Sequence, residues 1–286
     1  MKKTLMLALI ASLPLAWNAD VMAQDWSKEY ETTKISDRLY TFWRRGIRNI
    51  FVVTDEGVIA TDPISPEAAA VYRAEIAKVT DLPVRYVIYS HEHWDHVLGG
   101  QIFKDEGAEF ISHENCLKFF FRNPNPDLVI PDRTISGNTL FDLGGESFHL
   151  RYLGENHGDC LLVFDFPEER AIYLADLATD GFIGLGTMPD YDLIEYLRSL
   201  REIEAMDFDL MIGAHGPARA GKDAVVIRRR WMETIIDAVG RELKAGTPVA
   251  AIAGKLHFPE FEHLRGYESQ LPAFVLRMAQ FHEMGW

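Results

Sequence analysis

The residues best suited to chemistry lie in one short segment, 91–96, which reads His-Glu-His-Trp-Asp-His. Imidazole and carboxylate groups are natural ligands of Zn²⁺. The segment follows an apolar run that is expected to form a largely buried strand. Because a loop after a strand can turn alternate side chains into one pocket, we expect His91 and His93 to face one ion. Asp95 and His96 are expected to face a second.

Three residues further along the chain complete a candidate ligand set. Asp176 ends an apolar strand expected at 171–175, where a carboxylate would be costly to bury without a partner. His215 also follows an apolar strand, and His157 stands in an Asn-His-Gly-Asp segment. Two metal ions about 3.5–4 Å apart can lower the pKa of a bound water to near neutrality, so the resulting hydroxide can attack and no serine or cysteine nucleophile is needed. No Gly-x-Ser-x-Gly segment is present.

The elements that must position these residues alternate between strands and helices. A helix is predicted over 66–79, with Ser65 as its N-cap and Pro66 at its first position. Other helices are predicted at 101 onward, 114–122, 191–205, 222–244 and in the tail after 246, with a loop at 123–136. Strands are predicted at 39–43, 50–54, 58–61, 84–89, 108–112, 140–143, 148–153, 161–166, 171–175 and 210–212. Two strand-rich halves with helices attached indicate two packed sheets with helices outside.

Bulk composition narrows the function classes. The 286 residues are 48% hydrophobic, which suffices for a sizeable core. A net charge of −14 argues against a nucleic-acid partner and leaves a small-molecule substrate as the expected one. The oligomeric state is not predicted by any of these features.

The ligand residues and their order resemble those of the metallo-β-lactamase superfamily. The resemblance rests on the motif at 91–96, on Asp62 after a strand, and on His157, Asp176 and His215 in the family's order. It implies an α+β fold, an αββα sandwich of two mixed sheets flanked by helices, over residues 24–286. The ligand set is similar to that of glyoxalase II and lactonases of the superfamily.

The resemblance also implies roles for the individual residues. A first Zn²⁺ would be held by His91, His93 and His157. A second Zn²⁺ would be held by Asp95, His96 and His215, with Asp176 bridging both ions. Asp95 would in addition orient the attacking hydroxide and pass a proton to the leaving group. Asp62 is expected to lie beneath the metals and to fix an imidazole from behind.

This reading predicts a zinc-dependent hydrolase that cleaves an ester, lactone, thioester or amide of a small molecule. One alternative is a β-lactamase, although the cysteine-type enzymes place a thiolate where Asp176 stands. The others are a metal-binding accessory protein and an iron oxidoreductase of the same fold.

Substrate contacts are predicted at positions around this site. Arg44 lies in a hairpin that overhangs the site in the family, and it could grip a carboxylate or phosphate; a solvated turn is the favoured alternative. Phe182 and Met188 lie in a Gly-rich apolar loop after Asp176 that could be a lid or could simply pack.

The two cysteines and the first residues bear on location. Residues 1–23 carry Lys2 and Lys3, an apolar run and Ala23, which is typical of a signal peptide. A periplasmic or secreted protein, with no membrane attachment after cleavage, is therefore expected. That compartment would permit one disulfide, but Cys116 and Cys160 fall in apolar segments and are interpreted as two unpaired buried side chains.

Overall fold

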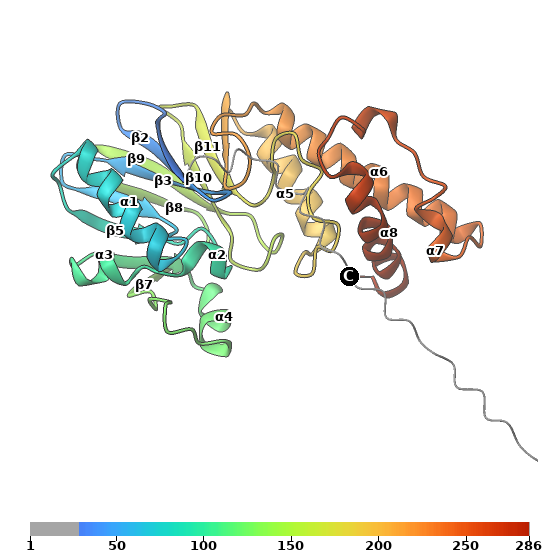
Figure 1. The fold of residues 1–286 in the computed structure, drawn as a ribbon, viewed down its shortest axis with the longest axis horizontal. Helices are drawn as coiled ribbons and strands as arrows, with labels where there is room; N and C mark the ends of the chain where they lie inside the picture. The colour runs from blue at the N-terminus through green and yellow to red at the C-terminus, as the bar shows by residue number, and fades with distance from the viewer. Residues whose placement is uncertain (1–28, 286) are drawn as a thin grey trace, which may run out of the picture.

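The computed structural model describes residues 29–285, so the expected signal peptide lies outside the described residues. Two mixed β-sheets lie face to face, as the sequence predicted (Figure 1). The larger sheet has seven strands in chain order: β1 (Tyr30–Lys34), β2 (Leu39–Arg44), β3 (Ile47–Val53), β4 (Val58–Thr61), β5 (Val84–Ile88), β6 (Glu109–His113) and β7 (Arg133–Ile135). The smaller sheet has five, in the order β12 (Leu210–Gly213), β11 (Ala171–Ala175), β10 (Leu162–Phe166), β9 (Glu146–Tyr152) and β8 (Thr139–Leu143).

Helices flank the two sheets and extend the molecule at one end (Figure 1). They are α1 (Pro66–Val79), α2 (Trp94–Val97), α3 (Gln101–Asp105), α4 (Cys116–Arg122), α5 (Leu193–Ala205), α6 (Asp223–Lys244), α7 (Val249–Ile252), the 3₁₀ helix η2 (Pro259–Phe261) and α8 (Tyr267–Met284). Among residues 29–285, no helix combines the length and the apolar composition that crossing a bilayer requires.

The start of α1 shows how local sequence sets an element. Ser65 is extended, and its hydroxyl accepts a hydrogen bond from the Ala68 amide at 3.1 Å. Pro66 occupies the first helical position, where no backbone donor is required. The predicted helix over 66–79 is confirmed. The short strands β1 and β7, by contrast, were not predicted, because neither has a run of apolar residues.

Two apolar clusters hold the layers together. The first fills the space between the sheets and continues to α5, α6 and α8. The second lies between the larger sheet and α1 with α3, where the Tyr72 ring packs 4.9 Å from Phe42 and 5.7 Å from Phe103. Figure 1 shows α6, α7 and α8 together at one end of the molecule.

The sandwich brings five chain segments to one edge. β4 and β5 are parallel neighbours, so the segments that follow them, with Asp62 and 91–96, emerge side by side. β11 and β12 are also parallel, which places Asp176 and His215 together. β10 runs antiparallel to β11, so His157, which precedes β10, comes to the same edge. These five segments, which span residues 62 to 215 of the chain, therefore meet at one edge of the sandwich.

The two cysteines form a disulfide, so the interpretation as unpaired buried side chains is wrong. Cys116 and Cys160 have a Cα–Cα distance of 5.2 Å and an S–S distance of 2.01 Å. Both are fully buried and they come from different segments, the start of α4 and the end of the loop that carries His157. Their apolar surroundings suggested packing alone. Their spatial proximity arises only when the sheets assemble.

Replacing both cysteines with serine should destabilise the fold. The bridge closes a segment of 44 residues, for which the chain-entropy model gives about 4 kcal/mol, within the usual cost of roughly 2–5 kcal/mol. Urea unfolding of the double variant against the oxidised parent measures the difference, with reduced parent protein as the control. An unchanged free energy of unfolding in both would contradict a structural role for the bridge.

Candidate metal centre

A first group of ligand atoms is formed by His91, His93, His157 and Asp176, whose donor atoms all lie within 4.8 Å of one another. His93 Nδ1 lies 3.1 Å from His157 Nε2. His157 Nε2 and His91 Nε2 lie 3.4 and 3.8 Å from Asp176 Oδ2. Four donors facing one point, at these separations, suit a single cation.

A second group of ligand atoms lies beside the first. Asp95, His96 and His215 also have donor atoms within 4.8 Å of one another. His96 Nε2 lies 3.7 Å from Asp95 Oδ2. The structure thus brings the seven candidate ligand residues together in two neighbouring groups.

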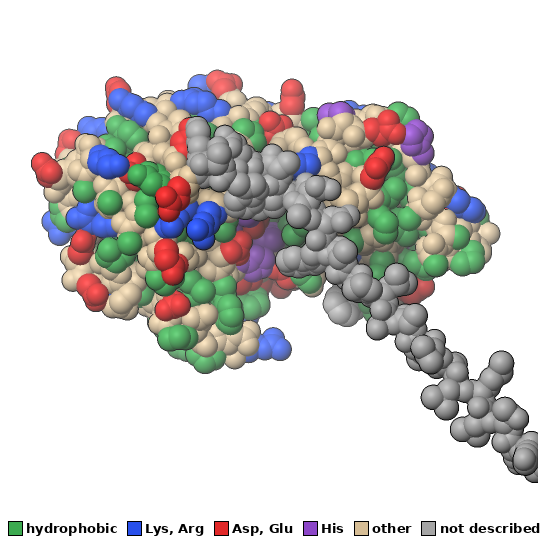
Figure 2. All heavy atoms as spheres, viewed as in Figure 1, with side chains coloured by type: hydrophobic (Ala, Val, Ile, Leu, Met, Phe, Trp, Pro, Cys, Tyr) green, Lys and Arg blue, Asp and Glu red, His purple; other side chains and the backbone are tan. Residues whose placement is uncertain are grey.

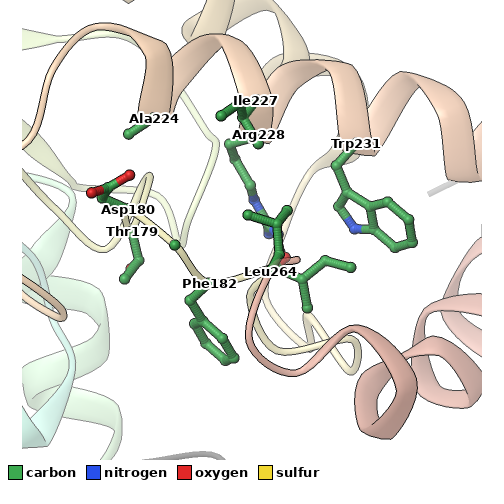
Figure 3. Close-up of a pocket in the computed structure, with 10 residues that line it drawn as sticks. Thr179, Asp180, Phe182, Ala224, Ile227, Arg228, Trp231 and Leu264 are labelled. Atoms are coloured by element: carbon green, nitrogen blue, oxygen red, sulfur yellow. The ribbon is translucent and has the colours of Figure 1, made fainter. Parts of the chain in front are cut away.

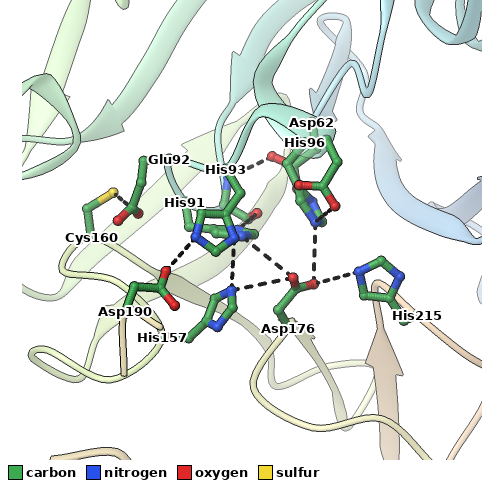
Figure 4. Close-up of polar contacts among 12 residues, drawn as sticks. Asp62, His91, Glu92, His93, His96, His157, Cys160, Asp176, Asp190 and His215 are labelled. Atoms are coloured by element: carbon green, nitrogen blue, oxygen red, sulfur yellow. Dashed lines mark hydrogen bonds and ion pairs between the residues drawn. The ribbon is translucent and has the colours of Figure 1, made fainter. Parts of the chain in front are cut away.

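Asp176 lies between the two groups. Its Oδ2 faces His91 and His157, while its Oδ1 lies 3.4 Å from His96 Nε2 and 3.3 Å from His215 Nε2 (Figure 4). It follows directly after β11, whose last residue, Ala175, has a positive φ of 46°. One carboxylate therefore presents an oxygen to each candidate ion position.

Buried polar atoms without hydrogen-bond partners show that these side chains fit metal ions. Within the described chain, His91 Nε2, His96 Nε2 and Asp176 Oδ1 have no hydrogen-bond partner. Unpaired buried polar atoms are costly, and most native ones have a partner. Zinc bonds of about 2.1 Å to two tetrahedral ligands place those ligands ~3.4 Å apart, close to the separations found here.

Hydrogen bonds behind the imidazoles set which nitrogen faces inward. His215 Nδ1 donates to the Gly46 carbonyl at 2.8 Å, and His91 Nδ1 contacts Ser90 Oγ at 2.9 Å. Each contact leaves Nε2 directed at Asp176. Such outer contacts fix tautomer and ring orientation in metal sites.

Asp62 has the position predicted for it, completely buried beneath His96. One oxygen accepts a hydrogen bond from the Ser90 amide at 2.8 Å. The other accepts from Tyr173 at 3.1 Å and lies 3.4 Å from His96 Nδ1. A single carboxylate therefore positions the end of β5, the His96 ring and the smaller sheet at once.

Without a metal, the imidazoles and the carboxylate perturb each other strongly. Burial, followed by the neighbouring His96 and His93, lowers the pKa of His91 well below its usual value. Burial alone would lower the pKa of His96, but Asp176 and Asp95 raise it well above the ordinary value. Burial would raise the pKa of Asp176, but His215 and His96 hold it well below the usual range. The single negative charge of Asp176 thus interacts with several imidazole rings at once. Such an arrangement is expected of a site that binds cations.

Two residues of the site were not predicted from the sequence. Asp190 Oδ2 lies 2.6 Å from His93 Nε2, which turns His93 Nδ1 toward the first group. The Tyr191 ring packs edge-on against His157 at 4.6 Å. Both lie in the loop before α5, where only the N-cap Asp192 has a recognisable sequence signal. Their role depends on where that loop returns in space.

Beside the first group lies a cavity of about 300 Å³, lined by Glu92, His93, Trp94, Phe119, Phe120, Asn123 and Asp190. In the space-filling view, a group of histidine side chains is visible near the middle of the face, with acidic side chains beside it (Figure 2). Burial raises the pKa of Glu92, whose Oε2 lies 2.9 Å from Cys160 Sγ.

The residues predicted to contact substrate lie elsewhere. Arg44 is buried and donates to the Glu67 carbonyl at the start of α1. Met188 is 1% exposed, and its carbonyl accepts a hydrogen bond from Arg277 at 3.1 Å. Phe182 packs on Arg265 and lines a void of only about 10 Å³, about the space of one water (Figure 3). None of the three lines the cavity beside His93.

Residues 43–215 match the model of the metallo-beta-lactamase superfamily. The chain is 29% identical over 198 residues to the 2,4-dinitroanisole O-demethylase subunit alpha of Nocardioides sp. (strain JS1661), covering 68% of this chain and 60% of that protein. It is 26% identical over 171 residues to the hydroxyacylglutathione hydrolase of Francisella tularensis subsp. tularensis (strain WY96-3418), covering 59% and 63%. The chain thus spans less than two thirds of these relatives.

Solved structures show the same fold. A metallo-beta-lactamase from Pontibacter korlensis superposes with a TM-score of 0.64 and 18% identity, over 71% of this chain and 99% of that one. The stereoselective inverting sec-alkylsulfatase Pisa1 from Pseudomonas sp. superposes with a TM-score of 0.73 and 15% identity, over 90% of this chain and 50% of that one. At these identities the likeness establishes the fold.

Proposed function

The chain belongs to the metallo-beta-lactamase superfamily, because the model of that family matches residues 43–215 of its 286 residues. We propose that the chain is a metal-dependent hydrolase that cleaves an acyl-type bond of a small molecule. The bond is an ester, lactone, thioester or amide. The observation that carries the proposal is the position of Asp176, with one carboxylate oxygen toward each of two histidine groups. The two ions are proposed to be Zn²⁺.

Each side chain has a definite part in this proposal. When bound, two Zn²⁺ ions supply Lewis-acid polarisation and lower the pKa of a water toward neutrality. Asp95 is the accessible carboxylate of the second group, with its side chain 51% exposed, so it can reach both a water and a leaving group. Asp62 and Asp190 hold His96 and His93 in place from behind.

The relatives bear on the choice of reaction without deciding it. The match to a hydroxyacylglutathione hydrolase favours acyl hydrolysis, whereas the match to an O-demethylase subunit favours removal of a methyl group from oxygen. A β-lactamase, an oxidoreductase that uses iron and a metal-binding accessory protein stay as alternatives. They differ in metal content and in the substrates turned over.

The test combines metal analysis with a substrate panel on one sample. We expect two zinc ions per chain and turnover of at least one ester, lactone or thioester, lost after chelation and restored by Zn²⁺. A β-lactam serves as the comparison substrate. One tightly held iron with no second ion, or two zincs with no acyl turnover, would refute the proposed hydrolase.

We also propose that the mature chain starts at Gln24 and is exported. The disulfide supports this, because disulfides persist in oxidising compartments. The intact mass of protein recovered from the periplasm of a bacterial host should lack residues 1–23. A recovered mass that still includes Met1 to Ala23 would contradict export with cleavage.

A further inference from the structure

We propose that the cavity beside His93 is a specificity pocket for an uncharged aromatic group of the substrate. The inference rests on the proposed function, because it assigns the substrate class of the same site. The cavity shares His93 with the first ligand group and Asp190 with the contact that orients His93. A group held there therefore lies next to the position where the bond would be cleaved.

The walls of the cavity are aromatic. Trp94, from the motif at 91–96 itself, lines the cavity and is 49% exposed, so its ring is available to a ligand. Phe119 and Phe120 face it from α4, and Phe120 is 1% exposed. A volume of about 300 Å³ is at the lower end of the range for small-molecule sites. Aromatic walls favour an aromatic ring, which can stack or meet them edge to face.

The side chains that line the cavity offer an anion no cationic partner. Its polar lining groups are the carboxyl groups of Glu92 and Asp190, the imidazole of His93 and the amide of Asn123, and no lysine or arginine of the described chain lines it. Lys118 on α4 lies 5.0 Å from the Phe119 ring and is paired with Asp159. A carboxylate or sulfonate held among these aromatic and carboxyl side chains would therefore lose its water without gaining a cationic side chain, which is costly.

The disulfide fixes the aromatic wall to the ligand loop. α4 begins at Cys116, and the bridge joins it to Cys160, three residues after His157. Asn115, just before α4, also donates to the Asp159 carbonyl at 3.1 Å. The position of Phe119 is thus coupled to the loop that carries His157, so the pocket is preformed.

Binding of two matched anilides tests the pocket apart from catalysis. The probes are 4-methylsulfonylacetanilide, which is neutral, and 4-acetamidobenzenesulfonate, which has a similar shape and a fixed negative charge. In calorimetric titrations of the zinc-loaded protein, the neutral probe should bind at least about 10-fold more tightly. Phe119→Ala should weaken its binding by about 10-fold.

The controls come from the same helix. Phe121→Ala removes a phenylalanine that is 65% exposed and does not line the cavity, so it should leave both affinities unchanged. Asn123→Lys places a cation at the exposed rim and should raise the affinity for the sulfonate. That gain also shows that the pocket remains folded.

Two results would overturn the pocket: equal affinities for the two probes, or an unchanged affinity for the neutral probe in Phe119→Ala. Either could occur while acyl substrates are still cleaved, and the proposed hydrolase would then survive without this pocket. If the probes behave as expected but no acyl substrate is turned over, the pocket is supported and the proposed hydrolysis fails.

Discussion

Asp176→Asn should reduce the bound metal from two ions per chain to one or none, and should abolish most of the activity. The substitution keeps the shape but removes the charge that both ligand groups share. Outer contacts of metal ligands are typically worth 10–100-fold in affinity or activity, so the loss of a shared ligand should exceed this, at roughly 10³-fold in kcat/KM. Elemental analysis after dialysis and initial rates on the best acyl substrate measure the two effects.

Thermal unfolding gives a second measurement that does not depend on catalysis. Metal that binds only the folded state stabilises it by about 2.7 kcal/mol at 100 times Kd, so added Zn²⁺ should raise the Tm of the parent by several degrees. This rise should be much smaller in Asp176→Asn. Asp180→Asn, an exposed aspartate in the same loop and outside both groups, is the matched control. Equal zinc content and equal Tm shifts in parent and Asp176→Asn would show that Asp176 is not a metal ligand.

The ligand groups could be predicted because their signals are local or tied to strand ends. The motif at 91–96 places four of the seven candidate ligands within six residues. Asp176 directly follows one buried strand and His215 lies two residues after another. A carboxylate at the end of a buried strand is costly unless it has a partner, so its presence there indicates a function. The helix over 66–79 was equally well marked, by a serine cap followed by proline.

The parts that sequence reasoning missed depend on long-range assembly. Cys116 and Cys160 are 44 residues apart in apolar surroundings, and only the approach of α4 to the His157 loop brings the sulfurs together. Asp190 becomes a partner of His93 because the loop after Asp176 returns to the site. That loop is held in part by Arg277, whose Nη2 donates to the Tyr191 carbonyl at 2.9 Å from α8. The sequence around Asp190 therefore gives no sign of its contact with His93, because that contact depends on a loop held by the C-terminal helix α8.

The substrate contacts illustrate the same limit. Arg44 was a candidate from its place in an overhanging hairpin, with a solvated turn as the favoured alternative; the structure shows it buried, with its guanidinium bonded to the start of α1. The aromatic wall that we propose for the substrate comes from α4, whose sequence indicated only a helix. A side chain's orientation relative to a site depends on packing between elements, which periodicity within one element does not report.

Asp95→Asn should lower kcat by about 10²–10⁴-fold with both metals bound, the usual contribution of a general acid or base. Asp95 is the exposed member of the second group, 3.7 Å from His96 Nε2, and it is proposed to orient the attacking water and to protonate the leaving group. Asparagine keeps the size of the side chain but can neither accept nor return that proton. Steady-state rates at saturating Zn²⁺, with zinc content verified, isolate this loss from weaker metal binding.

Comparison with Asp62→Asn separates proton transfer from metal positioning. Asp62 is completely buried and acts from behind the site, through His96 and its hydrogen bonds with Ser90 and Tyr173, so its variant should lose roughly 10–100-fold and should recover much of the activity as Zn²⁺ is raised. Asp95→Asn should not recover. Its defect should instead shrink when an alkoxide leaving group is replaced by 4-nitrophenolate, because a stable leaving anion needs no proton. If Asp95→Asn kept near-normal kcat with two zincs bound, or lost equally with both leaving groups, Asp95 could not be the proton donor, and its carboxylate would serve the second metal alone.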